Sequence, residues 1–245
     1  MHAVQVDQLS FKYKDQQSLI SNLDLIIGPG ERFGIFGPNG AGKTTLMSLI
    51  TGLLPYKLGS IKIYGQEVRN NHQHINKIIG FVPQDFSFYE DLSPVENMEF
   101  FGAWYGMDSV TIKKRTKTLL EIMGLSAVSN KLVKTFSGGM KRRVNLTIGV
   151  MNQPKILFLD EPTVGVDVQS RNAIIAFLKE INEAGTTLVY TSHQLNEAED
   201  LCNTVALFDQ GKIIVKDNLQ HLLKGQSQTS LEELFLQLTG RAYRD

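Results

Sequence analysis

The stretch Gly37-Pro38-Asn39-Gly40-Ala41-Gly42-Lys43-Thr44 matches the pattern G-x-x-x-x-G-K-[ST]. In this pattern the glycines let backbone N–H groups curl around phosphate oxygens, while Lys43 reaches the β- and γ-phosphates and Thr44 offers a hydroxyl to Mg²⁺. An apolar strand is expected before it, at 32–36, and a helix after it, at 45–50, with its N-terminus facing the anion. The stretch therefore predicts a nucleoside triphosphate cradle.

A later apolar run ends in two carboxylates. Residues 156–159 are continuously apolar, which is typical of a strand buried on both faces of a parallel sheet, and Asp160-Glu161 follows where that strand ends. Asp160 is predicted to hold Mg²⁺ opposite Thr44, and Glu161 to orient or deprotonate the water that attacks the γ-phosphate. Alone, such a run is equally consistent with a simple strand end, but the upstream cradle favours the catalytic interpretation.

Ser137-Gly138-Gly139 precedes an amphipathic helical pattern over 140–151. Glycines at a helix N-terminus expose N–H donors, so this tripeptide predicts a second anion site. An ordinary serine cap followed by flexible glycines is the alternative. The presence of the cradle favours the anion site.

The composition favours a globular cytoplasmic protein. Lys plus Arg and Asp plus Glu both number 25 in 245 residues, so no overall basic field recruits nucleic acid, and none is expected as the main partner. The one cysteine, Cys202, fits a reducing compartment. We expect neither a membrane span nor a signal peptide, because no apolar run approaches roughly 20 residues and the N-terminus lacks a basic region followed by an apolar one.

The chain is predicted to be an α/β protein with two additions. Short alternating runs before about residue 36 predict an N-terminal antiparallel β subdomain. A helical stretch, whose first helix is capped by Ser93, predicts an inserted helical subdomain, and β/α alternation resumes beyond Pro154. We assign one domain in three parts: a nucleotide-binding core at 1–84 and 152–225, the helical subdomain at 85–151, and a C-terminal helix within 226–245.

The C-terminal helix is predicted from an N-terminal capping residue and from an apolar helix face. Ser230 begins a capping-box pattern after a brief polar linker at 225–229. The spacing i, i+3, i+4, i+7 places four apolar residues on one side, namely Leu231, Leu234, Phe235 and Leu238.

In their order along the chain, these motifs resemble the ATP-binding-cassette (ABC) ATPase family over nearly the whole length. The match rests on the cradle from Gly37 to Thr45, Gln84 after an apolar strand, Phe136-Ser137-Gly138-Gly139-Met140, Asp160-Glu161, Asp167 and His193. The resemblance implies a P-loop NTPase core that binds ATP with Mg²⁺. It also implies a head-to-tail dimer, in which ATP lies between the cradle of one copy and the Ser-Gly-Gly of the other, so that a homodimer would contain two composite sites.

The resemblance gives roles to four further residues. Tyr13 is similar to the aromatic residue that stacks on adenine, although packing is the alternative for a tyrosine in a strand. Gln84 resembles the residue that links the γ-phosphate and Mg²⁺ to the helical subdomain, with a strand-end amide as the alternative. His193 resembles the histidine that contacts the γ-phosphate. Asp167 resembles the residue that crosses the dimer to the partner's cradle, and a helix cap is its alternative.

Together these observations assign three groups of site residues. The catalytic group is Glu161, His193, Lys43 and Gln84. The nucleotide-binding group is Tyr13, Gly37, Pro38, Asn39, Gly40, Ala41, Gly42, Lys43, Thr44, Thr45, Ser137, Gly138, Gly139 and Asp167. The metal-binding group is Thr44, Gln84 and Asp160.

Two departures from the family pattern are expected to matter. The signature of the family reads Leu-Ser-Gly-Gly-Gln, whereas Phe136 and Met140 flank the tripeptide here. The donors that face phosphate remain, so ATP closure is expected to be retained with altered strength. Before Asp167 the family often has a small polar residue and a leucine, and the stretch Val164-Gly165-Val166 in their place puts communication between the two sites in doubt.

The region from Phe81 to Phe101, together with 231–241, resembles the type 2 exporter branch that includes drug-efflux ATPases. Aromatic residues crowd this region, and they form either an apolar groove for a helix of a separate transmembrane permease subunit or the core of the helical subdomain. They are Phe86, Phe88, Tyr89, Phe100, Phe101, Trp104 and Tyr105. The resemblance implies a peripheral location on the inner face of the cell membrane.

Two other functions stay open. A non-transport ABC ATPase acting on ribosomes or DNA usually carries two cassettes or long coiled coils, and neither is visible in this sequence. An importer ATPase often extends into a regulatory domain, for which few residues remain.

Overall fold

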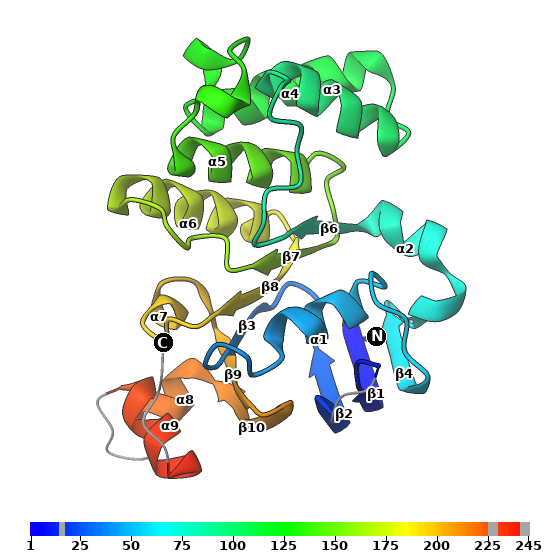
Figure 1. Ribbon diagram of the computed structural model, residues 1–245, viewed down its shortest axis with the longest axis vertical. Helices are drawn as coiled ribbons and strands as arrows, with labels where there is room; N and C mark the ends of the chain where they lie inside the picture. The colour runs from blue at the N-terminus through cyan, green and yellow to red at the C-terminus, as the bar shows by residue number, and fades with distance from the viewer. Residues whose placement is uncertain (15–17, 225–229, 241–245) are drawn as a thin grey trace.

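The computed structural model describes residues 1–14, 18–224 and 230–240, and a six-stranded sheet lies at its centre (Figure 1). Its strand order is β10-β9-β3-β8-β7-β6, with β10 antiparallel to β9 and the other neighbours parallel. The strands are β3 (Arg32–Phe36), β6 (Ile79–Val82), β7 (Ile156–Asp160), β8 (Thr187–Ser192), β9 (Thr204–Asp209) and β10 (Lys212–Asn218). This sheet is the α/β core that the sequence predicts.

The central strands separate two hydrophobic cores. In β7, Leu157 and Leu159 pack among the helices on one face, whereas Ile156 and Phe158 pack on the opposite face. Alternate residues of a strand point to opposite faces, so a strand buried on both sides must be apolar throughout. The run before Asp160 is continuously apolar because both faces of β7 are buried.

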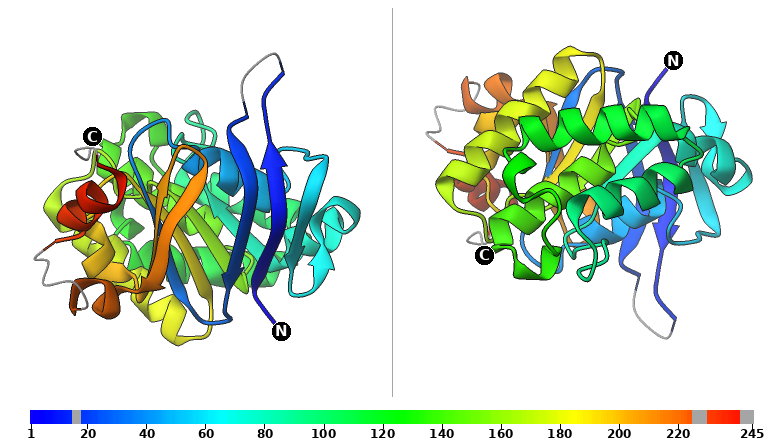
Figure 2. Two further views of the ribbon diagram at one scale, coloured as in Figure 1. Left: turned by 90° about the horizontal axis from the view of Figure 1, so that it is seen from below. Right: turned by 90° about the horizontal axis from the view of Figure 1, so that it is seen from above.

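A second sheet, which is antiparallel, lies beside the central sheet (Figure 2), and the two sheets share one hydrophobic core with α1 (Lys43–Ile50). Its strand order is β2-β1-β4-β5, and its first two strands lie in the segment before the cradle for which antiparallel strands are predicted. The strands are β1 (Val4–Phe11), β2 (Ile20–Ile27), β4 (Leu58–Ile63) and β5 (Gln66–Glu67). A 3-10 turn at Val68–Asn70 and the helix α2 (His72–Ile78), neither of them predicted, lead into β6.

The inserted helices form one end of the molecule, far from the antiparallel sheet (Figure 1). They are α3 (Pro94–Trp104), α4 (Ser109–Ile122) and α5 (Gly138–Gly149), with short 3-10 helices at Ser126–Val128 and Val133–Thr135. α3 begins with the predicted capping box: Ser93 Oγ accepts from the Glu96 amide (3.3 Å), and the Glu96 carboxylate accepts from the Ser93 amide (2.7 Å).

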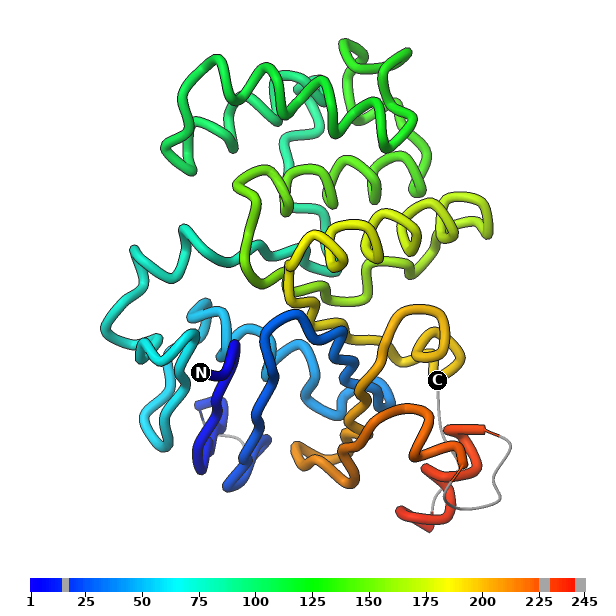
Figure 3. Tube along the Cα trace, turned by 180° about the vertical axis from the view of Figure 1, so that it is seen from behind, coloured from blue at the N-terminus to red at the C-terminus, as the bar shows by residue number. Residues whose placement is uncertain are grey.

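The remaining helices are α6 (Val168–Glu183), α7 (Glu197–Leu201), α8 (Leu219–Lys224) and α9 (Leu231–Thr239). α6 lies between α5 and the central sheet, as the reverse view shows (Figure 3). Within the three described ranges, no helix has both the length and the apolarity that a bilayer span requires.

The C-terminal helix differs from its prediction at one position. Ser230 Oγ accepts from the Glu233 amide (3.3 Å) as expected, and three of the four predicted apolar residues are buried: Leu231, Leu234 and Phe235. Leu238 is 42% exposed, because the last turn of α9, which is capped by Gly240, extends beyond the core that its first two turns cover. The predicted linker at 225–229 lies outside the described residues.

Candidate nucleotide site

The glycine loop forms the turn between β3 and α1, and its geometry explains its glycines. Gly40 and Gly42 have φ of 79° and 104°, the left-handed region that glycine enters without strain. A Cβ on Gly37 would lie 1.9 Å from the backbone oxygen of Phe208 on β9. Gly42 is the N-cap of α1, so the loop presents backbone donors at a helix N-terminus, which is a favourable place for an anion.

Lys43 folds back onto this loop. Its Nζ donates to the carbonyl oxygens of Gly37 (2.7 Å) and Pro38 (3.1 Å) and lies 3.8 Å from Glu161 Oε1. Burial lowers the pKa of the ammonium, and the nearby carboxylates of Glu161 and Asp160 oppose that shift. A buried ammonium with rotatable donors can exchange a carbonyl partner for a phosphate oxygen.

Asp160 ends β7 inside the protein and contacts the start of α1. Its carboxylate accepts from the hydroxyl of Thr191 (2.5 Å) on β8, and the hydroxyl of Thr44 also bonds to it. Burial raises the pKa of Asp160, while these two hydrogen bonds pull it back. The structure thus brings together Thr44 and Asp160, two of the three predicted metal ligands. Thr191 was not predicted, although it lies two residues before His193.

Glu161 and His193 meet at the carboxyl ends of β7 and β8. His193 Nδ1 lies 3.0 Å from Glu161 Oε1, and the same oxygen faces Lys43. Glu161 has φ of 48°, held by hydrogen bonds from its amide to the carbonyl (3.1 Å) and hydroxyl (3.3 Å) of Thr191. A non-glycine residue in this conformation is uncommon, and such strain gathers at functional sites. The arrangement places a carboxylate, an imidazole and an ammonium together beside the glycine loop.

Gln84 lies at the same edge of the sheet, two residues beyond β6, which pairs with β7. Its side chain is exposed, and its backbone carbonyl accepts from Arg142 Nη1 (2.6 Å) on α5. Arg142 Nη2 also donates to the Val164 carbonyl (3.3 Å), and the guanidinium lies 4.9 Å from the centre of the Phe86 ring. Arg142 therefore ties the Gln84 segment to the segment before Asp167. Sequence reasoning missed it; its position one turn after Ser137-Gly138-Gly139 was the available signal.

A second group of predicted site residues lies at the N-termini of α5 and α6. It comprises Ser137, Gly138, Gly139 and Asp167. Ser137 and Asp167 cap these helices: Ser137 Oγ accepts from the Met140 amide (3.3 Å), and Asp167 Oδ1 accepts from the Ser170 amide (2.9 Å). Hydrogen bonds from Ser170 lower the pKa of Asp167. Both residues therefore act as helix caps, and Ser137, Gly138 and Asp167 are exposed.

Gly139 packs directly against the start of α6, where an added Cβ would lie 2.9 Å from Ser170 Oγ and 3.1 Å from Asp167 Oδ2. Gly139→Ala should therefore lower the melting temperature by roughly 2–12 °C through overpacking. Gly138→Ala is the matched control, because its nearest contact would be 3.8 Å away. Thermal unfolding without nucleotide measures both variants, and equal melting temperatures would contradict the close packing of α5 on α6.

Tyr13 lies beside the start of α1. Its hydroxyl is 3.1 Å from Thr45 Oγ1, and its ring packs edge to face on Phe11 with centroids 5.0 Å apart. The ring is about a third exposed, which leaves a face for a base to stack on, so adenine stacking stays a prediction. Phe136 is buried in the helical core and Met140 packs against that core, so both departures from the family signature serve packing.

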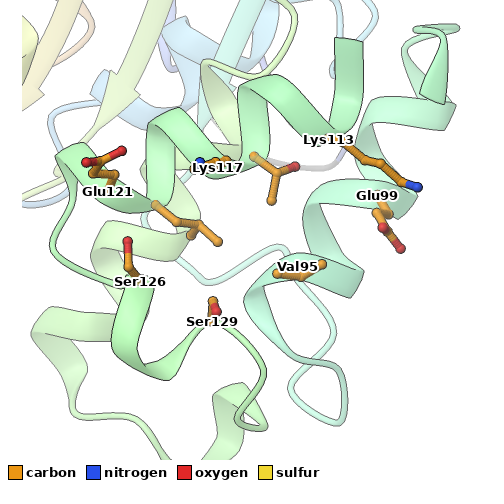
Figure 4. A pocket seen from close by; sticks show the side chains of 9 residues that line it. Val95, Glu99, Lys113, Lys117, Glu121, Ser126 and Ser129 are labelled. Atoms are coloured by element: carbon orange, nitrogen blue, oxygen red, sulfur yellow. The ribbon is translucent and has the colours of Figure 1, made fainter. Parts of the chain in front are cut away.

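A cavity of about 440 Å³ lies between α3 and α4, away from all these residues (Figure 4). Its lining includes Val95, Glu99, Lys113 and Lys117, and no predicted site residue borders it. The candidate site is therefore the edge of the central sheet and not this cavity.

The strand, glycine loop and helix, with a buried strand ending in Asp160-Glu161 beside them, define a P-loop nucleoside triphosphatase. Comparison with known families narrows the class: a family model described as ABC transporter matches residues 20–164. The chain belongs to the ABC transporter family. The chain carries the ATP-binding domain of that family, the class of ATPase domain that the sequence predicts.

Two named relatives are similar over most of this chain. The linearmycin resistance ATP-binding protein LnrL of Bacillus subtilis is 41% identical over 199 residues, which are 81% of this chain and 64% of that protein. The Nod factor export ATP-binding protein I of Cupriavidus metallidurans is 35% identical over 217 residues, which are 89% of this chain and 72% of that protein. This chain thus spans less than two thirds of the length of LnrL.

Solved structures share the fold. One described as an ATP binding subunit of an ABC transporter aligns with a TM-score of 0.88 at 26% identity, covering 97% of this chain and 99% of that chain. A dimeric, post-hydrolysis structure of the cassette MJ0796 bound to ADP and Pi aligns with a TM-score of 0.80 at 26% identity, covering 88% and 98%. These alignments confirm the predicted fold class.

Proposed function

We propose that this chain powers an exporter by driving a separate membrane subunit through ATP-dependent closure of a dimer. The observation that carries the proposal is the contact of Glu161 with His193 and Lys43 beside the glycine loop, because it joins a base to the groups that bind phosphate. The names of the two relatives, one for resistance and one for export, support outward transport.

In the proposed reaction, Lys43 and the loop N–H groups bind the β- and γ-phosphates. Glu161 takes a proton from the attacking water, whose oxygen bonds to the γ-phosphorus as the bond to the β–γ bridging oxygen breaks and ADP leaves with that electron pair. His193 holds the Glu161 carboxylate in place and contacts the γ-phosphate. The burial of Glu161 and Lys43 keeps bulk water away, so their charges act strongly on the substrate.

Thr44 and Asp160 are the residues that would hold Mg²⁺, with Gln84 joining them from the end of the neighbouring strand. A hydroxyl and a carboxylate, completed by substrate phosphates, make a ligand set that suits this ion. Bound there, Mg²⁺ would neutralise charge that develops on the phosphate oxygens.

The dimer in this proposal completes the site. Ser137 and Gly138 are exposed, and Gly139 packs on the start of α6 rather than on the cradle of its own chain. Their exposed donors at the start of α5 would therefore bind the ATP held by a second copy, with Asp167 reaching the partner's cradle. The dimeric cassette bound to ADP and Pi supports this arrangement.

The docking surface for the membrane subunit is proposed between α2, β6 and α3. A cavity of about 500 Å³ opens there, and Leu53 and Trp104 at its border are 62% and 78% exposed. Of the predicted aromatic groove, four residues are exposed, namely Phe86, Tyr89, Phe100 and Trp104, while Phe88 is buried in the helical core. Of the predicted aromatic residues, Phe101, Trp104 and Tyr105 line this cavity, and a helix of the membrane subunit is proposed to pack there.

Co-purification tests the function. The tagged chain, extracted gently from host membranes, should retain a polytopic membrane protein in stoichiometric amount, which would place it at the cytoplasmic face of the membrane. Ribosomal or DNA-bound partners without a membrane subunit would favour the non-transport alternative. A solute-binding protein in the complex would favour an importer.

Trp104→Ala should reduce recovery of that membrane subunit about 10-fold or more, because an exposed tryptophan in a groove is a strong anchor. ATP hydrolysis by the isolated chain should not change. Val110→Ala, which removes an equally exposed apolar side chain from α4, is the control. Undiminished recovery with Trp104→Ala would reject this groove as the docking surface.

A further inference from the structure

A buried carboxylate on α7 contacts three of the segments that lead to the candidate site. Glu197 is 2% exposed. Its Oε1 accepts from Thr163 Oγ1 (2.7 Å), and its Oε2 accepts from the hydroxyls of Tyr190 (2.8 Å) and Ser192 (2.5 Å). Arg171 Nε lies 3.5 Å from Oε1. A buried carboxylate is costly unless such donors and a cation surround it, so these contacts fix the position of Glu197.

The partners of Glu197 lie next to predicted site residues in the sequence. Thr163 lies two residues after Glu161, and Ser192 directly precedes His193. Arg171 lies on α6 one turn after Asp167, whose carbonyl accepts from the Arg171 amide (2.9 Å). Glu197 therefore touches the three segments that carry Glu161, His193 and Asp167.

The Ser192 bond has a defined direction. Ser192 Oγ accepts from the Gln194 amide (2.9 Å), and its single proton is donated to Glu197. The residues on both sides of His193 are thus held through one hydroxyl, and that hydroxyl is held by Glu197. The carboxylate therefore supports the turn that presents His193 to Glu161.

We propose that Glu197 is a positioning residue for ATP hydrolysis. It holds Thr163 and Ser192 so that Glu161 and His193 keep their 3.0 Å contact, and through Arg171 it ties this pair to the helix that begins at Asp167. The inference rests on the ATPase reaction proposed above, but it concerns a residue outside the set that contacts the nucleotide.

The chain offers a matched control in the antiparallel sheet. The Glu67 carboxylate accepts from Tyr56 (2.7 Å), Ser60 (2.6 Å) and Arg69 (3.1 Å), three of the four partner types that surround Glu197, at a less buried site. None of these residues belongs to the predicted site. Glu67→Gln and Ser60→Ala therefore report what loss of such a cluster does to stability alone.

The test compares Glu197→Gln with Glu67→Gln in equilibrium ATP binding and in single-turnover hydrolysis. Glu197→Gln should lower the hydrolysis rate about 10- to 100-fold, the cost expected of a misplaced catalytic group, with ATP affinity within about 2-fold of wild type. Glu67→Gln should leave both unchanged. In a His193→Ala background Glu197→Gln should cost little more, because the two act as a unit.

Three outcomes would overturn the proposal: an unchanged rate in Glu197→Gln, an equal rate loss in Glu67→Gln, or a full additional loss in the His193→Ala background. If thermal unfolding shows that Glu197→Gln does not fold, Ser192→Ala and its control Ser60→Ala replace the pair with the same expectations. Because the wild-type ATPase rate is measured alongside, failure of this inference is distinguishable from failure of the proposed function.

Discussion

Replacing Glu161 by Gln should lower the rate of ATP hydrolysis about 10²- to 10⁴-fold, the contribution expected of a positioned general base. ATP affinity should stay close to that of wild type, because the amide keeps the size of the side chain and its acceptor oxygen for His193. Phosphate release measures the rate, and equilibrium titration with ATP measures the affinity.

The expectation follows from how Glu161 is held. Its backbone at φ of 48° is fixed by Thr191, and its Oε1 faces both His193 and Lys43, so the side chain has a defined orientation. A glutamine in that orientation cannot take a proton from water. Glu180→Gln, on the exposed face of α6, is the control. Turnover near the wild-type rate in Glu161→Gln would refute the base assignment.

Lys43→Ala should weaken ATP binding about 10- to 100-fold, because hydrogen bonds to charged groups contribute about 1.5–3 kcal/mol and each tenfold in affinity corresponds to about 1.4 kcal/mol. The substitution removes the buried cation nearest the loop and leaves Glu161 without its positive neighbour. Binding of ATP in the absence of turnover, for example in a Glu161→Gln background, isolates this effect from hydrolysis.

Lys179→Ala, which removes an exposed lysine from α6, controls for the loss of a positive charge. A thermal unfolding curve of Lys43→Ala shows whether the variant is folded, so that weaker ATP binding is not mistaken for unfolding. If a folded Lys43→Ala variant binds ATP within about twofold of wild type, the glycine loop does not hold the phosphates through this residue, and the assigned cradle is wrong.

The parts of the site that are local in sequence were predictable. The glycine loop needs positive φ values and a close approach to the backbone of β9 that only glycine allows. Its glycine pattern can therefore be recognised from the sequence alone. The run that ends in Asp160-Glu161 is apolar because both faces of β7 are buried. In both cases the physical cause acts on neighbouring residues.

The contacts that connect distant segments were not predictable. Arg142 joins the Gln84 segment to Val164, and Glu197 joins Thr163 to Ser192, yet a lone arginine or glutamate on a helix carries no periodic signal. The buried side of α9 stops before Leu238 for a similar reason, since helical spacing defines a face but not how far a core extends along it.

The account depends on ATP being held between two copies, and the molar mass of Glu161→Gln in solution tests this most directly. With ATP and Mg²⁺, light scattering after size exclusion should show the mass of two chains, and it should show one chain without nucleotide. Adding Ser137→Arg, which blocks the exposed donors of the second copy, should restore one chain with ATP bound. A single-chain mass for Glu161→Gln saturated with ATP would contradict the composite site.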